Sequence, residues 1–269
     1  MRLGEVIAGS RTALVTGASK GIGRCYAGQL AALGYNVLMV ASGEAELVAT
    51  FKEVSQVNPN VWVKYLVKDL ATQTAAQEMF AYTETEGIKV DVLINNAGIF
   101  SFCDILSTPI ERIERMILLH DLNATIMCRL YAADMIERGG GRILNMSSYS
   151  IWMPYPGLSL YSASKAYLKS FSVAFSKEVE DKGVTVTAIC PAGIATDLYG
   201  LSKKLQRFGL KTGILMSPES CARRALNGMF RGVRCKVPDW WFRLFIPFCL
   251  LVSGPVMRWL RNFTMKFQK

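Results

Sequence analysis

Short runs of apolar residues alternate along the chain with longer segments in which apolar residues recur at helical spacing. The runs predict β-strands at 11–16, 36–41, 61–67, 90–95, 142–147, 184–190 and 233–237. The segments between them predict helices at 22–33, 44–57, 72–86, 110–138, 159–181 and 218–230. Strands that are apolar nearly throughout are typical of a parallel sheet with both faces covered. The alternation therefore predicts an α/β fold with about seven parallel strands and a ligand crevice at their carboxyl ends.

The same alternation defines one domain and an extension. No stretch rich in Pro, Gly or Ser interrupts it, so we expect residues 1–237 to form a single domain built on a Rossmann-like, doubly wound sheet. At 238–269 the alternation stops, and an aromatic and basic C-terminal extension begins.

Composition and charge separate these two parts further. Of the 269 residues, 51% are hydrophobic and 19% are charged, which excludes a disordered chain. The net charge of +10 is uneven, because residues 1–200 carry 17 basic and 19 acidic side chains whereas 201–269 carry 14 and two. Charge recognition by a partner is therefore expected at the C-terminal end.

The cysteines indicate the compartment. Seven of them stand singly, without a Cys-x-x-Cys pair, which favours reduced thiols in a cytoplasmic setting over a disulfide framework or a zinc cluster. No charged leader with an apolar core precedes the first predicted strand, so secretion is not expected.

A glycine-rich turn joins the first predicted strand to the first predicted helix. Gly17, Gly21 and Gly23 follow the spacing Gly-x-x-x-Gly-x-Gly. Glycine allows a tight turn, close approach of backbone to phosphate and close packing of helix on sheet, and the helix N-terminus offers N–H groups to a pyrophosphate. The turn is predicted to bind a dinucleotide, although by itself it is equally compatible with a tight strand-to-helix turn.

The end of the second predicted strand bears on which dinucleotide binds. NAD enzymes place a carboxylate there to hold the ribose 2′-hydroxyl, whereas this chain has Ser42 and no carboxylate until Glu44. Lys20 and Arg24 flank the glycine turn, where a cation can meet a 2′-phosphate. The pattern favours NADP(H) without excluding NAD(H), and solvated side chains at the helix start are the alternative interpretation of the two cations.

Three residues form a candidate catalytic group. Tyr161 and Lys165 lie at positions i and i+4 of a predicted helix, so they share a face, and a nearby ammonium favours the phenolate and lowers the pKa of a tyrosine. Ser148 ends a predicted strand thirteen residues upstream, where a hydroxyl can hold a substrate oxygen. Ser147 adjoins it, but the spacing favours Ser148. A Tyr-x-x-x-Lys pair alone is more typical of an ordinary amphipathic helix face.

Taken together, these motifs resemble the short-chain dehydrogenase/reductase family over about residues 10–237. The resemblance rests on the glycine turn, Tyr161, Lys165, Ser148, Asp69-Leu70, Asn95-Asn96-Ala97-Gly98, Asn123 and Pro191 through Thr196. The chain departs from the family's usual Pro-Gly at Pro191-Ala192, with Gly193 one place later, so the loop beneath the nicotinamide can be shifted.

The resemblance implies a role for each of these residues. Tyr161 would be the acid/base, Lys165 would hold the nicotinamide ribose and lower the pKa of Tyr161, Ser148 would orient the carbonyl, and Asn123 would anchor a water that relays protons. Asp69 and Asn95 would meet the adenosine half. The cofactor-binding residues implied are Gly17, Ser19, Lys20, Gly21, Ile22, Gly23, Ser42, Asp69, Leu70, Asn95, Ala97, Gly98, Tyr161, Lys165, Pro191, Ile194 and Thr196.

Two apolar segments border the expected substrate site. Residues 151–158 contain Trp152 and Tyr155 and no cation, and residues 198–216 form a predicted lid that contains Tyr199 and mixes apolar with basic side chains. We expect Ser148 and Tyr161 to contact the substrate together with Trp152, Tyr155 and Tyr199. The lining suits a bulky lipophilic ketone or alcohol such as a steroid, a bile acid or a long-chain 3-oxoacyl lipid.

The partners are inferred from helix faces and from the extension. Residues 110–138 and 159–181 carry broad apolar faces. The resemblance implies that these helices pair between subunits in a homodimer or homotetramer, although a monomer's core would show the same faces. His120, the single histidine, excludes a histidine-based metal site or triad and is interpreted as a packed or interface residue. Residues 239–269 favour peripheral membrane contact and no nucleic acid, with a tail folded over the substrate mouth or packed on another subunit as alternatives.

The leading hypothesis is an NADPH-dependent reductase of a bulky lipophilic ketone. An NAD-linked alcohol or hydroxysteroid dehydrogenase working in the oxidative direction is one alternative. A non-catalytic dinucleotide-binding protein at a membrane is the other, and the intact set of Ser148, Tyr161 and Lys165 argues against it.

Overall fold

A seven-stranded parallel sheet runs through the centre of the molecule. The computed structural model describes residues 4–153, 155–196, 198, 202–239, 241–250, 255–256 and 262. The strands are β1 (Thr12–Thr16), β2 (Asn36–Ala41), β3 (Val63–Val67), β4 (Val92–Asn95), β5 (Gly141–Met146), β6 (Val184–Ile189) and β7 (Cys235–Lys236). Their order is β3-β2-β1-β4-β5-β6-β7, and the chain reverses direction across the sheet between β3 and β4. The predicted fold class is confirmed.

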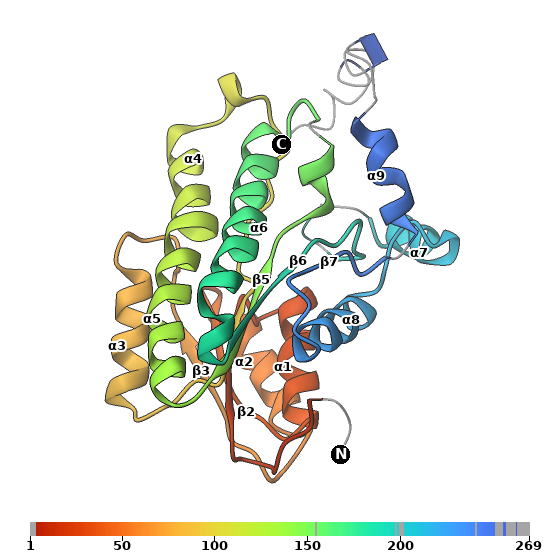
Figure 1. Ribbon diagram of the computed structural model, residues 1–269. Helices are drawn as coiled ribbons and strands as arrows, with labels where there is room; N and C mark the ends of the chain where they lie inside the picture. The colour runs from red at the N-terminus through yellow and green to blue at the C-terminus, as the bar shows by residue number, and fades with distance from the viewer. Residues whose placement is uncertain are drawn as a thin grey trace.

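Helices cover both faces of the sheet (Figure 1). They are α1 (Gly21–Ala32), α2 (Glu44–Val54), α3 (Ala75–Thr85), α4 (Ile110–Ile117), α5 (Asn123–Glu137), α6 (Ser159–Val179), α7 (Lys203–Thr212), α8 (Pro218–Phe230) and α9 (Phe242–Leu250). One apolar core lies between the sheet and α1, α2 and α8, and a second lies between the sheet and α3, α5 and α6. Because both faces are covered, β1, β2 and β4 are buried at every position, as their apolar sequences predict.

The long helix predicted at 110–138 is interrupted. A π-helical turn, η2 (Leu118–Leu122), separates α4 from α5. The backbone N–H of Asn123 bonds to the carbonyl of Leu118, five residues earlier, and the Asn123 side-chain amide donates to the same oxygen over 3.0 Å. The extra residue in this turn changes which side chains point inward, an effect that apolar periodicity does not reveal.

The carboxyl end of the sheet carries α7 and α9. Helix α7 lies within the segment predicted as the lid, and Tyr199, which was expected to contact the substrate, lies outside the described residues. Helix α9 packs against the 3₁₀ turn η3 (Tyr149–Trp152), where the hydroxyl of Tyr149 donates to the carbonyl of Phe242 over 2.9 Å. In the described part of the chain, no helix combines the length and apolar character needed to cross a membrane.

Candidate active site

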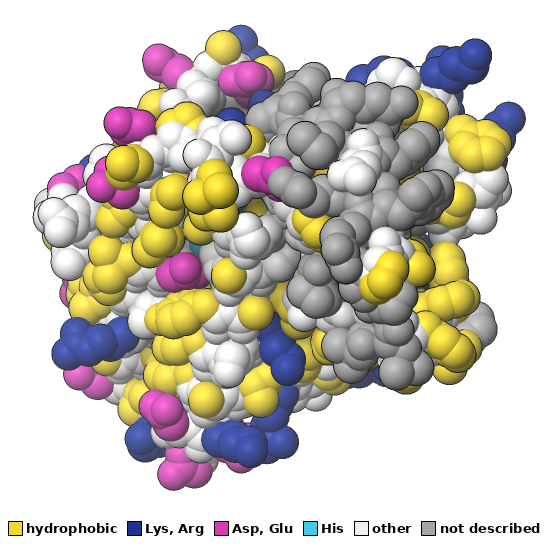
Figure 2. Space-filling view, turned by 90° about the horizontal axis from the view of Figure 1, so that it is seen from above, with side chains coloured by type: hydrophobic (Ala, Val, Ile, Leu, Met, Phe, Trp, Pro, Cys, Tyr) yellow, Lys and Arg dark blue, Asp and Glu magenta, His cyan; other side chains and the backbone are white. Residues whose placement is uncertain are grey.

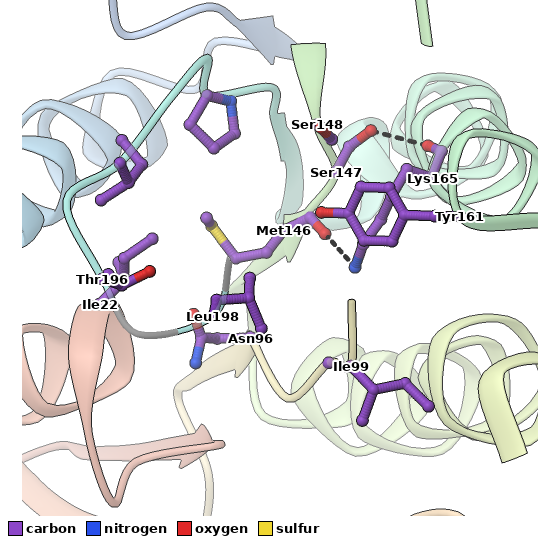
Figure 3. Close-up of a pocket in the computed structure, with 13 residues that line it drawn as sticks. Ile22, Asn96, Ile99, Met146, Ser147, Ser148, Tyr161, Lys165, Thr196 and Leu198 are labelled. Atoms are coloured by element: carbon purple, nitrogen blue, oxygen red, sulfur yellow. Dashed lines mark hydrogen bonds between the residues drawn. The ribbon is translucent and has the colours of Figure 1, made fainter. Parts of the chain in front are cut away.

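The crevice at the carboxyl ends of the strands gathers most of the expected catalytic residues. Its volume is about 500 Å³, part of it open to solvent, and it lies where the sheet order reverses. Figure 3 shows Ser148, Tyr161 and Lys165 on one side, with Ile22 and Thr196 across from them. The lining residues are Ile22, Asn96, Gly98, Ile99, Met146, Ser147, Ser148, Tyr161, Lys165, Pro191, Ile194, Thr196 and Leu198.

The glycine turn is shaped to accept a phosphate. Gly17 and Gly21 have φ of 63° and 57°, in the left-handed region that favours glycine. A Cβ at Gly23 would lie 2.0 Å from the Gly17 carbonyl oxygen, so this close packing excludes a side chain. Lys20 caps α1 without a side-chain hydrogen bond to the first turn, which leaves the turn's N–H groups for an anion. The residues present therefore fit a bound pyrophosphate.

Asn96 ties this turn to the loop after β4. Its side-chain amide donates to the carbonyls of Thr16 and Gly17 over 3.0 and 3.2 Å, and the Thr16 hydroxyl accepts from the backbone N–H groups of Asn96 and Ala97. The motif was recognised in the sequence, but Asn96 was not among the expected site residues. An amide with two donors beside a glycine turn is the signal that could have identified it.

Tyr161 is a buried phenol beside Ser148. Its side chain is 5% exposed, and the ring of Phe100 packs edge-on against it at 5.0 Å between centroids. Burial raises the pKa of Tyr161 to about 12, and a favourable interaction with the Ser148 hydroxyl opposes this shift. The expected lowering of this pKa by Lys165 is absent, because desolvation of the phenolate dominates. The phenol is therefore protonated at neutral pH.

Lys165 is a buried ammonium beside this phenol. Its Nζ donates to the carbonyl of Met146 over 3.0 Å and lies 5.9 Å from the centroid of the Tyr161 ring. Burial lowers the pKa of Lys165 to about 8, and the negative charge of Asp121 opposes the shift. Burial also raises the pKa of Asp121 to about 6, and one of its carboxylate oxygens is buried without a hydrogen-bond partner among the described residues.

The two adjacent serines have different roles. Ser147 donates to the backbone carbonyl of Lys165 over 2.7 Å, so its hydroxyl holds helix α6 against β5. The Ser148 hydroxyl accepts from the backbone N–H of Ser150 over 3.1 Å and lines the crevice together with Tyr161. Of the two serine hydroxyls, that of Ser148 lowers the pKa of the phenol.

Two asparagines from the expected set lie outside this crevice. The Asn123 amide donates to the carbonyls of Leu70, Thr72 and Leu118, and its oxygen accepts from Ala76 N–H, so it anchors the loop before α3. Asn95 is buried against Asn145, to which it donates over 2.8 Å. Both line a smaller neighbouring cavity together with Thr16, Leu70, Ala97, Leu119, His120, Ala124, Met127 and Leu168.

The expected adenosine end is exposed and already ion-paired. Asp69 accepts from Ala71 N–H over 2.9 Å and pairs with Arg115 over 3.0 Å, and these contacts outweigh partial burial and lower its pKa. Lys20 lies 4.0 Å from Glu46, which also approaches Gly43 so closely that a Cβ there would lie 2.7 Å from a carboxylate oxygen. A carboxylate therefore does reach the end of β2.

Several other residues that were expected to bind the cofactor or the substrate do not line the crevice. Ser42 is exposed at the end of β2, and Arg24 pairs with Glu53 over 3.3 Å. Trp152 packs on Tyr149 at 5.4 Å, and Tyr155 packs near Phe102 at 6.0 Å between ring centroids. None of these residues lines the crevice itself. Leu198 of the predicted lid does line it, and so do Ile99 and Met146, which, like Phe100 beside Tyr161, were not expected at the site.

The parallel sheet, the phosphate-ready glycine turn and the crevice that gathers Ser148, Tyr161 and Lys165 fit a bound nicotinamide dinucleotide. The model of the short chain dehydrogenase family matches residues 11–206, and the chain belongs to this family.

Known proteins similar to this chain include two curated relatives and a solved structure. A very-long-chain 3-oxoacyl-CoA reductase of Coccidioides immitis is 29% identical over 85% of this chain and 66% of its own length. Hydroxysteroid dehydrogenase-like protein 1 of Gallus gallus is 30% identical over 86% and 68%. The chain thus spans about two thirds of the length of these relatives. A short-chain dehydrogenase of Sphingobium yanoikuyae in complex with NADPH is 28% identical, with a TM-score of 0.77 over 91% of this chain and 96% of that one.

Proposed function

We propose that the protein is an NADPH-dependent reductase of a bulky lipophilic ketone. The observation that carries this proposal is the placement of the buried Tyr161 and Ser148 hydroxyls in one crevice beside the buried ammonium of Lys165. A phenol that is protonated at neutral pH is suited to donate a proton, which favours reduction of a ketone over oxidation of an alcohol.

The chain's own groups perform the proton chemistry. A bound nicotinamide would supply hydride to the carbonyl carbon. The Tyr161 hydroxyl gives its proton to the carbonyl oxygen, while the Ser148 hydroxyl donates a hydrogen bond to the same oxygen as negative charge develops there. Lys165 stabilises the resulting phenolate through its positive charge, because both groups are buried where charges interact strongly.

The preference for NADPH is the finer part of the proposal. Lys20 stands beside the phosphate-ready turn, and the structurally similar dehydrogenase of Sphingobium yanoikuyae is described with NADPH. Glu46 supports the alternative, an NAD-linked dehydrogenase, because a carboxylate repels a 2′-phosphate and accepts from a 2′-hydroxyl. We propose that, when NADPH binds, Lys20 leaves Glu46 and pairs with the 2′-phosphate.

The apolar surroundings of the crevice support a lipophilic substrate. Ile22, Met146 and Leu198 line it, and Phe100 packs against Tyr161. The names of the relatives refer to a very-long-chain 3-oxoacyl-CoA and to hydroxysteroids. We propose a substrate of this kind, with an extended apolar body.

Calorimetric titration with NADPH and NADH, followed by NADPH oxidation with a panel of steroid and long-chain 3-oxoacyl ketones, tests these proposals. At least tenfold tighter binding of NADPH, about 1.4 kcal/mol, with turnover of a ketone is the expected result. Tighter binding of NADH would favour the oxidative alternative. Binding of a dinucleotide with no turnover of any ketone or alcohol would favour the non-catalytic one.

Peripheral membrane contact is proposed for the surface formed by α7 and α9. Figure 2, which looks onto this end of the molecule, shows hydrophobic and basic side chains exposed together. Leu244 and Phe248 of α9 and Phe208 of α7 are more than half exposed. Arg207 and Arg243, next to Phe208 and Leu244 in the sequence, are exposed as well. Sedimentation with anionic vesicles should retain the protein at low salt and release it at high salt.

A homodimer or homotetramer is proposed from the opposite side of the molecule. Tyr167, Phe171 and Phe175 stack along α6. The side chain of Tyr167 is 44% exposed, and that of Ile117 of α4 is 45% exposed. The exposed Tyr167 and Ile117 side chains suit contact with a second copy of the chain. Sedimentation equilibrium at micromolar concentration distinguishes the oligomer from a monomer.

A further inference from the structure

The π-helical turn η2 directs His120 into the protein, next to the catalytic group. His120 is the only histidine in the sequence, and its side chain is 1% exposed. Its ring meets the Tyr161 ring edge-on, with 6.1 Å between the centroids. Single π-helical turns inside α-helices frequently occur at functional sites, because they redirect a side chain without breaking the helix. The proton chemistry described above gives His120 no role.

The hydrogen bonds of His120 determine its protonation. Nε2 accepts from the backbone N–H of Ile99 over 3.0 Å, so this nitrogen carries no proton. Nδ1 lies 2.9 Å from the hydroxyl of Ser164, whose own proton is donated to the carbonyl of Tyr161 over 2.9 Å. Nδ1 must therefore be the donor to Ser164, and the imidazole is neutral with its proton on Nδ1.

These bonds connect the loop after β4 to helix α6 around Lys165. Ile99 belongs to the loop and lines the crevice, whereas Ser164 precedes Lys165 on the helix. A Cβ added at Gly98 would lie 3.0 Å from Nε2 of His120 and 3.5 Å from Nζ of Lys165. The imidazole and the ammonium thus flank the same glycine, and the ring occupies one wall of the space that holds the ammonium.

We propose that His120 is a positioning residue of the active site, which holds the Gly98–Ile99 turn against helix α6 and thereby fixes the ammonium of Lys165 beside Tyr161. Asn123, which the family resemblance assigned near the proton path, has its side chain bonded to backbone at four points away from the crevice. The effect of His120 on turnover rests on the proposed reductase function, but its bonding and protonation do not.

A neutral imidazole is required at this place for two physical reasons. Protonation of Nε2 would remove the acceptor for Ile99 N–H and add a second cation beside Lys165. Burial and the charge of Lys165 lower the pKa of His120 well below its usual range. Helix α6 presents Lys165 and Tyr161 to His120. Asp121, from the same turn as His120, acts on Lys165 through its negative charge.

The protonation state can be tested without any substrate. Because His120 is the only histidine, the untagged wild-type protein labelled with ¹⁵N-histidine gives ring signals from this residue alone. We expect a protonated Nδ1 and an unprotonated Nε2 that persist from pH 8 to about pH 5.5, below the ordinary histidine pKa of about 6.5. A neutral ring protonated on Nε2, or titration near pH 6.5, would overturn the proposal.

Two amide variants separate the two bonds. Gln at position 120 can place its carbonyl oxygen where Nε2 accepts from Ile99, whereas Asn can place its amide only where Nδ1 donates to Ser164. We expect His120→Leu to lower kcat and weaken NADPH binding at least tenfold, His120→Gln to retain both within about threefold, and His120→Asn to fall between them. Equal losses in His120→Leu and His120→Gln, or wild-type values in His120→Leu, would contradict the proposal.

A failed reductase function would give a different set of results. If wild-type protein turns over no ketone, the NADPH affinities of the three variants and the ¹⁵N spectra still report on His120. If wild-type protein is active and the Leu and Gln variants behave alike in both measurements, the positioning role is wrong while the reductase function stands. Thermal melts of each variant show whether a loss of binding reflects unfolding. If His120→Leu is unfolded, the NADPH affinities of His120→Gln and His120→Asn are compared with each other, and equal values would contradict the proposal.

Discussion

The two ends of the expected cofactor site are built differently. Around Tyr161 and Lys165 the polar groups are buried, and the Lys165 ammonium donates to a backbone carbonyl. At the adenosine end, Lys20 and Glu46 form an exposed pair 4.0 Å apart, with 71% and 57% of their side chains accessible. Loss of a buried group that the reaction needs lowers the rate by orders of magnitude, whereas exposed ion pairs contribute about 0–1 kcal/mol. Substitutions should therefore abolish the chemistry at one end but only adjust cofactor choice at the other.

Removal of the buried cation should give the largest effect. Lys165→Met is expected to lower kcat by about 10²-fold or more, because the phenolate of Tyr161 loses its compensating charge. The same change should raise the free energy of unfolding at pH 7 by on the order of 1 kcal/mol, since the buried ammonium has a pKa lowered to about 8.

The sign of the stability change depends on pH. In the unfolded chain the lysine keeps its proton up to about pH 10.4. The buried charge therefore destabilises the folded wild-type protein fully below pH 8, and this destabilisation disappears as the pH rises from about 8 to about 10.4. Urea unfolding of the wild-type protein and of Lys165→Met at pH 7 and pH 10 measures this difference in stability. A variant that is less stable at pH 7 would contradict this account of burial.

A methyl group in the glycine turn should give the next effect. Gly23→Ala would place a Cβ 2.0 Å from the Gly17 carbonyl oxygen, so the turn must shift. We expect a loss of about 1–3 kcal/mol in stability and at least tenfold weaker dinucleotide binding by calorimetry. Gly28→Ala on the same helix is the matched control, since nothing lies within 4 Å of its Cβ. Equal effects of both changes would show that helix content, not the turn, is responsible.

Neutralisation of the buried carboxylate should shift the pH profile. Asp121 favours the charged form of Lys165, so Asp121→Asn should lower the pKa of Lys165 further below its present value of about 8. The fall of kcat on the alkaline side should then begin at lower pH than in wild type, while the rate at pH 6 changes little. A profile shifted to higher pH, or left unmoved, would argue against electrostatic contact between these two groups.

The smallest effect is expected at the exposed end. Glu46→Gln removes the carboxylate beside Lys20 and Gly43, so NADPH should bind a few-fold more tightly relative to NADH. The gain should shrink at high salt, because exposed charges are screened. Side-by-side titrations of both cofactors at two salt concentrations measure it, and an unchanged ratio would remove Glu46 from cofactor selection.

The sequence predicted the parts of the site that depend on local spacing. Tyr161 and Lys165 share a helix face because four residues make about one turn, and Ser148 meets them because β5 ends beside α6. The fold class followed from apolar strands between helices and is confirmed. These features are regular, so a periodic pattern predicts them.

The rest depends on irregular geometry. A single extra residue in the η2 turn brings His120 to Lys165 and turns Asn123 to the loop before α3. Glu46 reaches back to Gly43 through a side-chain conformation that spacing does not specify. The lowered tyrosine pKa was expected from one neighbour, whereas burial, which depends on the whole fold, dominates it.

Substitution of Tyr161 by Phe tests the central claim most directly. The change removes one oxygen from a buried ring, so the packing against Phe100 and the calorimetric affinity for NADPH should remain nearly intact. Single-turnover reduction of the best ketone should slow by orders of magnitude, since the donated proton is lost. Turnover close to wild type with unchanged NADPH affinity would contradict the role of Tyr161 as the proton donor, and with it the proposed mechanism.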